Sequence, residues 1–94
     1  MSHLEFEWDE AKNLANIRNH GISFIEAQSV FADEYALLIA DPHHSEDEDR
    51  FLLLGLSGKL RVLVVCHCFE VNERLIRIIS CRKANRKETT RYRR

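Results

Sequence analysis

Four apolar runs of strand length, separated by short turns, constrain the fold of this chain more than any other feature. They occupy residues 35–40, 50–57, 60–69 and 73–80. Each run is shorter than an ordinary helix, and Ser57-Gly58-Lys59 and Glu70-Val71-Asn72 are typical turn sequences. Consecutive strands at this spacing predict an antiparallel meander. We expect the nearly continuous apolar run over 50–57 to be a central strand, covered on both faces.

A first helix is predicted ahead of these strands. Asp9 is a suitable N-cap for a helix over residues 10–20, and Gly21 is a suitable C′ residue to end it. The apolar stripe of this helix would consist of Ala11, Leu14, Ala15 and Ile17.

A second helix, over residues 24–32, is indicated by Ser23-Phe24-Ile25-Glu26, which matches a capping box. Residues 4–8 alternate apolar and acidic side chains, which is typical of a short edge strand. A basic helix is expected over residues 82–91. The predicted fold class is therefore α+β, as one domain over residues 1–94. Two N-terminal helices would pack on a four-stranded antiparallel sheet, with the further short edge strand and a basic C-terminal helix.

Composition limits the class of protein. A chain of 94 residues, 45% of them hydrophobic, has enough material for one small domain with one core. Its apolar runs are too short to cross a membrane, and no signal-peptide pattern opens the sequence. The three cysteines are odd in number and show no framework spacing, so we expect a reducing, cytoplasmic location.

The net charge of −1 conceals an uneven distribution. Residues 1–49 contain twelve acids and two bases, whereas residues 50–94 contain twelve bases and three acids. The two halves can attract each other within the fold, or they can direct an electrostatic field toward an anionic partner. The sequence is compatible with both interpretations.

The last two predicted strands sort their side chains by face. With a three-residue loop over residues 70–72, Phe69 pairs with Glu73. Alternation then places on a core face Val62, Val64, Cys66, Cys68, Ile76 and Ile78. The opposite face would carry Arg61, Leu63, Val65, His67, Glu73, Leu75, Arg77 and Ile79.

This second face groups Arg61 and Arg77 with the Glu73 carboxylate. Guanidinium groups bind phosphate and stabilise developing negative charge, and a carboxylate can accept a proton. The group therefore suits phosphate chemistry. It fits equally well a cross-strand ion pair on an exposed sheet face.

The chain ends in a strongly basic segment, in which seven of the residues 82–94 are Lys or Arg. Arg82 and Lys83 would lie in the first turn of the predicted helix, where positive charge opposes the helix dipole and a bound anion relieves the conflict. Arg86 extends the same face, and Tyr92 can stack on a base or donate to a phosphate. Alternatively, the tail is only an electrostatic footprint, and Tyr92 covers the sheet edge.

No metal site and no cofactor are predicted. Cys66-His67-Cys68 looks like a metal motif, but strand alternation sends the imidazole to the face opposite the two sulfurs, and zinc-knuckle spacing is absent. His43, His44 and the acids after them are expected to form a solvated loop rather than a cation site. His20, at the end of the first predicted helix, can simply cap the helix C-terminus.

Several motifs occur together along nearly the whole chain. They are W-D-x-x-K-N leading to N-H-G-I-S-F, E-D-R before a strand, and R-I-I-S-x-R-K-A followed by E-x-x-x-Y. In this combination the chain resembles the BrnT family of toxins, within the RelE-like superfamily. Cys81 stands where the family usually has Ala, which is a change between small residues.

The resemblance implies a RelE-like fold and a metal-independent endoribonuclease, a toxin in which the RNA's own 2′-OH attacks the adjacent phosphate. It also implies neutralisation by a BrnA-type antitoxin that binds DNA and represses the shared operon. By motif, the resemblance assigns to the active centre Arg61, Glu73, Arg77 and Arg82. With the basic segment, it assigns RNA contacts to Lys12, His20, Lys83, Arg86 and Tyr92.

Within this assignment Glu73 acts as base or orienter, and Arg61 and Arg77 contact the scissile phosphate. Arg82 and Tyr92 hold the RNA. Two other functions are compatible with the residues. One is a non-catalytic module that binds RNA or a partner chain, and the other is a degenerate toxin that acts only as a co-repressor.

Overall fold

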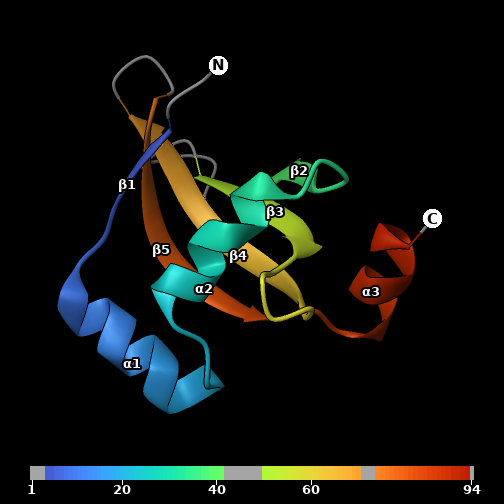
Figure 1. Ribbon diagram of the computed structural model, residues 1–94, viewed down its shortest axis with the longest axis horizontal. Helices are drawn as coiled ribbons and strands as arrows, with labels where there is room; N and C mark the ends of the chain where they lie inside the picture. Colours follow the sequence, from blue (N-terminus) through green and yellow to red (C-terminus); the bar gives the residue numbers. More distant parts are fainter. Residues whose placement is uncertain (1–3, 42–49, 71–73, 94) are drawn as a thin grey trace.

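The computed structural model describes residues 4–41, 50–70 and 74–93. This part of the chain has an α+β fold, as predicted. Its elements are β1 (Glu5–Glu7), α1 (Glu10–His20), α2 (Phe24–Ser29), the 3-10 helix η1 (Val30–Ala32), β2 (Leu37–Ala40), β3 (Arg50–Leu56), β4 (Val62–Glu70), β5 (Leu75–Lys83) and α3 (Arg86–Tyr92). Figure 1 shows α3 at the opposite end of the molecule from α1. None of the described helices is long and apolar enough to span a membrane.

The sheet has the strand order β1-β5-β4-β3-β2. Strands β2 to β5 pair as an antiparallel meander, which confirms that part of the prediction. The predicted total of four antiparallel strands is corrected, because β1 joins the sheet as a fifth strand, parallel to β5, with Phe6 opposite Ile76. Alternation shows which residues of a strand share a face but not which strand lies beside it, so the sequence could not predict this parallel pairing.

The predicted caps of the first two helices are confirmed. The Asp9 side chain accepts a hydrogen bond from the N–H of Ala11 at 2.8 Å. Gly21 ends α1 with a φ of 70°, in the left-handed region that glycine adopts most easily. Ser23 Oγ accepts from the N–H of Glu26 at 3.1 Å and so begins α2. The other half of the predicted capping box is not formed, because the Glu26 carboxylate accepts from Ser57 and Arg61 instead.

Helix α1 packs on the sheet through amide groups, which corrects the predicted apolar stripe. Asn16 donates to Cys81 O at 2.8 Å and accepts from the Cys81 N–H at 3.0 Å. In the described part of the chain, β1 pairs with β5 only from Leu75 to Arg77, and the Asn16 amide satisfies the backbone of Cys81 beyond that point. Leu14 and Ile17 are 55% and 41% exposed. Backbone hydrogen bonding, not burial of the apolar stripe, therefore sets how α1 faces the sheet.

The predicted register between β4 and β5 is wrong, although the two strands do pair. Phe69 lies opposite Ile76 instead of Glu73, and a bulge between Cys66 and His67 changes the register further along the strands. β4 is apolar on both faces, so two registers bury similar side chains and the hydrophobic pattern could not choose between them. Glu73 itself lies outside the residues that the structure describes.

The observed register assigns new residues to each face, since paired residues share a face. The face covered by α1 and α2 (the covered face) carries Leu63, Val65, His67, Phe69, Ile76, Ile78 and Cys81. The other (the open face) carries Val64, Cys66, Cys68, Arg77, Ser80 and Arg82. The core lies between the covered face and the helices, where Ile22, Phe24, Leu63 and Val65 are fully buried.

His67 is fully buried in this core, although the predicted register grouped it with Arg61 and Arg77. Its ring makes edge contacts with the rings of Phe31 and Phe69. Nδ1 lies 3.0 Å from Val65 O, a distance that suits N–H donation, and Nε2 has no hydrogen-bond partner among the described residues. Burial lowers the pKa of His67, so the imidazole is held neutral.

Helix α3 begins later than predicted. Asn85 is its N-cap, and the side chains of Asn85 and Glu88 each accept from the other's backbone N–H at 2.8 Å. Arg82 and Lys83 belong to β5 instead, because strand pairing continues until Lys83 lies opposite Leu63. The predicted conflict between these two cations and the helix dipole therefore does not arise. The capping box from Asn85 to Glu88 was the sequence signal for the true start.

Candidate active site on the open face

The open face of the sheet combines polar and aliphatic side chains from three strands. The strand pairing arranges them in three rows, namely Arg50, Cys68 and Arg77; Leu52, Cys66 and Ser80; and Leu54, Val64 and Arg82. Arginines from β3 and β5 thus stand at the sides of a floor made by smaller side chains. Guanidinium groups grouped around an apolar floor can bind a phosphate from more than one direction.

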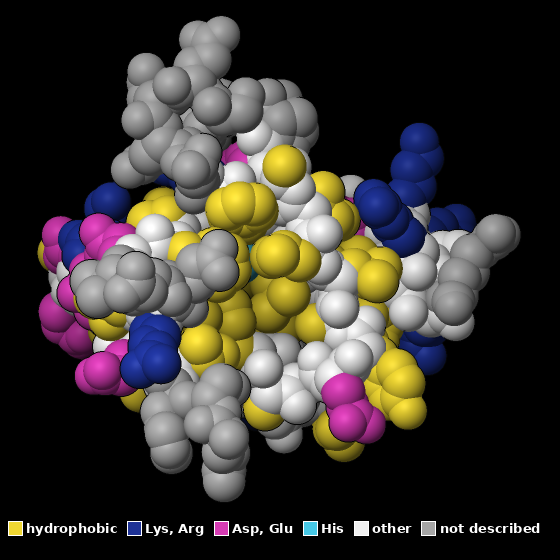
Figure 2. Space-filling model, turned by 90° about the horizontal axis from the view of Figure 1, so that it is seen from above, with side chains coloured by type: hydrophobic (Ala, Val, Ile, Leu, Met, Phe, Trp, Pro, Cys, Tyr) yellow, Lys and Arg dark blue, Asp and Glu magenta, His cyan; other side chains and the backbone are white. Residues whose placement is uncertain are grey.

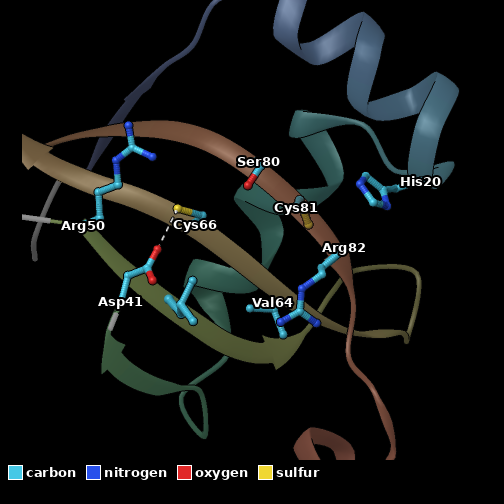
Figure 3. A pocket seen from close by; sticks show the side chains of 9 residues that line it. His20, Asp41, Arg50, Val64, Cys66, Ser80, Cys81 and Arg82 are labelled. Atoms are coloured by element: carbon cyan, nitrogen blue, oxygen red, sulfur yellow. Dashed lines mark hydrogen bonds between the residues drawn. The ribbon is translucent and has the colours of Figure 1, made fainter. Parts of the chain in front are cut away.

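A pocket of about 270 Å³ opens on this face (Figure 3). We call it the arginine pocket, and its lining consists of His20, Asp41, Arg50, Leu52, Val64, Cys66, Ser80, Cys81 and Arg82. Figure 3 shows Arg50 and Asp41 at one end and His20 and Arg82 at the other. Cys66 and Ser80 lie between the two ends. The pocket therefore places two guanidinium groups and an imidazole around one cavity.

Arg82 is held in position by Glu88 of α3. Its guanidinium donates two hydrogen bonds to the Glu88 carboxylate, at 2.8 and 2.9 Å, and a third to Lys83 O at 3.3 Å. The Glu88 carboxylate raises the pKa of Arg82, and Arg82 in turn lowers the pKa of Glu88. Within the described residues these contacts use three of the five N–H donors of a guanidinium. Arg82 is thus oriented and charged, and it retains donors for a ligand.

Asp41 and Cys66 are buried residues of the pocket lining. Asp41 is 5% exposed, and its Oδ2 lies 3.8 Å from Cys66 Sγ, which suits a weak S–H donor. Burial raises the pKa of the Cys66 thiol, the Asp41 carboxylate raises it further, and Arg50 opposes both. The thiol is therefore protonated near neutral pH and is a poor nucleophile. Cys66 serves as part of the pocket floor.

Comparisons with known proteins identify the family. The sequence profile described as "Ribonuclease toxin, BrnT, of type II toxin-antitoxin system" matches residues 8–88. This chain belongs to the BrnT family. A search of curated proteins gave no match.

Among solved structures, the 1.1 Å crystal structure of the Brucella abortus ribonuclease toxin BrnT is similar to this chain. The TM-score is 0.67 at 24% sequence identity, over 88% of this chain and 99% of that one. The likeness shows that the two proteins share a fold. The resemblance inferred from the sequence motifs is confirmed by the family match.

Arg61 does not join the arginine pocket of this BrnT-family chain. It reaches the opposite side of the sheet, where its Nε donates to Glu26 Oε2 at 2.9 Å and a second guanidinium nitrogen binds Glu26 Oε1. Arg77 lies opposite Cys68, seven residues along β4 from Arg61, which corresponds to about 23 Å at 3.3 Å per residue. The predicted grouping of Arg61 with Arg77 is therefore wrong, because it depended on the incorrect register.

Arg77 lies on the open face but outside the pocket lining. Cys68 pairs with both Arg50 and Arg77, so the two arginines flank it in the same row. Arg77 also donates to Glu7 Oε2 of β1 at 2.9 Å, and about 40% of its side chain is exposed. Arg77 thus extends the cationic surface of Arg50 and Arg82 toward β1.

The predicted RNA contacts are dispersed. His20 lines the arginine pocket, and Lys12, Lys83 and Arg86 are exposed outside its lining. Tyr92 donates to Asp33 Oδ2 at 2.6 Å, and so attaches α3 to the turn before β2. This contact matches the alternative in which Tyr92 covers the sheet edge.

The sequence interpretation did not single out Arg50 and Asp41 as site residues. The signals available were weak: Asp41 ends a predicted strand, and Arg50 belongs to the E-D-R motif before the next one. The two residues join because the Asp41 N–H donates to Arg50 O at 3.0 Å, which closes the end of the β2–β3 pair. The strand pairing, not the sequence spacing, brings them into one pocket.

The charge division is visible in part on the molecular surface. In Figure 2 the end that carries α3 shows mainly Lys and Arg side chains, whereas the opposite end shows most of the Asp and Glu side chains together with further Lys and Arg. Hydrophobic side chains occupy the area between them. Within the part of the chain that the structure describes, no group of three His, Cys, Asp or Glu side chains is arranged to hold a metal ion.

Proposed function

We propose that this chain is an RNA-cleaving toxin of a type II toxin–antitoxin system and that the arginine pocket is its active centre. The observation that carries the proposal is the pocket itself, where Arg50, Arg82 and His20 surround one cavity on the open face. Family membership supports the ribonuclease activity. The two arginines and the imidazole supply the phosphate-binding and proton-transferring groups that such an activity requires.

Cleavage would proceed by attack of the substrate's 2′-oxygen on the adjacent phosphorus, with rupture of the bond to the 5′-oxygen. The products are a 2′,3′-cyclic phosphate and a 5′-OH. Arg50 and Arg82 would neutralise the charge that develops on the phosphate oxygens, which is the largest contribution the protein can make. These arginines make the reaction independent of a metal ion in our proposal.

Two protons move in this reaction. One leaves the 2′-OH, and one must reach the 5′-oxygen as its bond to phosphorus breaks. We assign His20 to the 5′-oxygen, because imidazole is a frequent general acid and His20 lines the pocket near Arg82. The assignment of Glu73 as base remains a prediction, since Glu73 lies outside the described residues.

The partner in this proposal is a BrnA-type antitoxin, a DNA-binding protein that neutralises the toxin and represses the operon as a complex. The type II toxin–antitoxin family supports a protein antitoxin. Co-expression of the neighbouring gene should restore growth that the toxin alone arrests. A chain that does not arrest growth when expressed alone would instead be a degenerate toxin.

The function is tested with purified protein and a defined single-stranded RNA in the presence of EDTA. We expect cleavage with 2′,3′-cyclic phosphate ends, and protection when the 2′-OH at the cleaved position is replaced by hydrogen. Arg50→Ala should slow cleavage about 100-fold, a typical loss for one group that stabilises a transition state. Lys59→Ala, an exposed cation in the β3–β4 turn, is the matched control and should cleave normally. Protein that binds the RNA but leaves it intact would indicate the non-catalytic binding module.

A further inference from the structure

A second pocket lies on the open face between α3 and the sheet. Its volume is about 180 Å³, and its lining consists of Ile39, Leu52, Leu54, Val64, Glu88 and Arg91. We call it the aliphatic pocket. Four of its six residues are aliphatic and come from β2, β3 and β4, and the other two are charged residues of α3.

Two contacts hold α3 above this pocket. Glu88 binds Arg82 of β5 through two hydrogen bonds, and Tyr92 donates to Asp33 before β2. The helix is thus attached at both sides of the aliphatic floor. These contacts keep α3 over the aliphatic floor.

The aliphatic pocket borders the arginine pocket. Leu52 and Val64 line both cavities. The Arg82–Glu88 pair joins them as well, because Arg82 lines the first cavity and Glu88 lines the second. A ligand whose phosphate occupies the arginine pocket therefore has its next chemical group beside the aliphatic pocket.

The chemistry of the aliphatic pocket suits a nucleobase. An aliphatic floor favours the flat, weakly polar face of a base and disfavours a phosphate or a sugar hydroxyl, whose desolvation is costly. At the rim, Glu88 can only accept hydrogen bonds and Arg91 can only donate them, and the edge of a base offers groups of both kinds. A paired base could not enter the space beneath α3, so the base must be unpaired.

We propose that the aliphatic pocket binds the base of an unpaired nucleotide next to the phosphate that Arg50 and Arg82 hold. This inference rests on the proposed function and adds to it a base subsite in single-stranded RNA. Occupation of the subsite positions the scissile phosphate, so the base contributes to cleavage.

The test uses Ile39→Phe, whose larger side chain fills the aliphatic pocket from β2. Ile39 is chosen because it does not line the arginine pocket. Leu38→Phe is the matched control, since Leu38 is the adjacent residue on the same strand and 54% exposed. The substrates are short RNA strands with one cleavable linkage, each with one of the four bases or an abasic site at each flanking position. Circular dichroism and thermal unfolding verify that both variants fold.

We expect the wild type and Leu38→Phe to cleave the best base-containing strand about tenfold faster than the abasic strand, in line with the usual contribution of one bound base. Ile39→Phe should lose this advantage and cleave the abasic strand at the wild-type rate. Equal cleavage of base-containing and abasic strands by the wild type would overturn the subsite while leaving the proposed function intact. The subsite would also be overturned if Ile39→Phe lowered the cleavage rates of the base-containing and abasic strands by the same factor. Failure of the wild type to cleave any strand would reject the proposed function itself.

Discussion

The two faces of the sheet each hold an arginine bound to a glutamate, in very different surroundings. On the covered face Arg61 binds Glu26, whose side chain is 3% exposed. On the open face Arg82 binds Glu88, whose side chain is 25% exposed. The first pair joins the sheet to α2, and the second lines a pocket. The same two residue types therefore serve structure or ligand binding according to which face they occupy.

Glu26 can be buried because its carboxylate has several hydrogen-bond partners. Its carboxylate accepts from the Ser57 hydroxyl at 2.8 Å as well as from Arg61. A buried charge is stable only when it is paired and hydrogen-bonded, and Glu26 meets both conditions. Arg82 is partly exposed and retains donors, so a phosphate can approach it at a small cost.

The largest effect is expected from Arg82→Ala on the open face. Removal of this guanidinium should slow RNA cleavage about 100-fold, because it would stabilise the charge on the reacting phosphate. Its exposed pair with Glu88 should contribute less than about 1 kcal/mol to stability. Cleavage rates and chemical denaturation measure the two effects. Arg74→Ala, which removes an exposed cation outside the pocket lining, is the control. Full activity of Arg82→Ala would contradict the proposal that the open-face arginine binds the ligand.

Glu26→Gln should have the opposite effects to Arg82→Ala. It should lose about 2 kcal/mol in stability, and each folded molecule should cleave RNA at the normal rate. A fully buried pair would cost more, but 29% of the Arg61 side chain is in contact with solvent. Arg61 holds the pKa of Glu26 below its ordinary 4.5. The pair's contribution is thus present above about pH 4.5 and is lost as the pH falls through the lowered pKa.

Denaturation at pH 7 and again in the acid range measures the Glu26→Gln effect. The difference in stability between wild type and Glu26→Gln should shrink in acid. A variant that folds as well as the wild type but no longer cleaves RNA would assign Glu26 to the reaction and not to the structure.

The smallest effect, on the order of 1 kcal/mol, is expected from His67→Phe on the covered face. Burial keeps the pKa of His67 below its ordinary 6.5. Below that pH the unfolded chain takes up a proton that the folded protein does not, so stability falls as the pH falls. His67→Phe removes the titrating group, so the pH dependence of the stability should become flatter between about pH 6.5 and 5. An unchanged slope in denaturation experiments would show that His67 does not contribute.

Local signals in the sequence predicted much of the fold. The Asp9 and Ser23 caps, the Gly21 helix end and the four strands of the meander depend on neighbouring residues, and all are observed. Family motifs spread along the chain predicted its family correctly. The caps, the helix end and the strands could be predicted because their physical cause lies within a few residues.

The candidate site was less predictable, as Arg61 illustrates. The sequence placed Arg61 with Arg77, whereas the register directs Arg61 to Glu26 and leaves Arg77 near Arg50 on the open face. A single bulge between Cys66 and His67 changes the register along β4, and no local pattern announced it. Arg50 and Asp41 became site residues only through the pairing of β2 with β3.

The sequence by itself determined the elements, the α+β class and the family, because capping, turn chemistry and side-chain alternation act over short distances. Tertiary structure decided which face each arginine occupies, which groups share a pocket and how α1 faces the sheet. The physical reason is that β4 is apolar on both sides. Either face of such a strand can be buried, and contacts with distant parts of the chain, such as Asn16 with Cys81 and Arg61 with Glu26, decide between them.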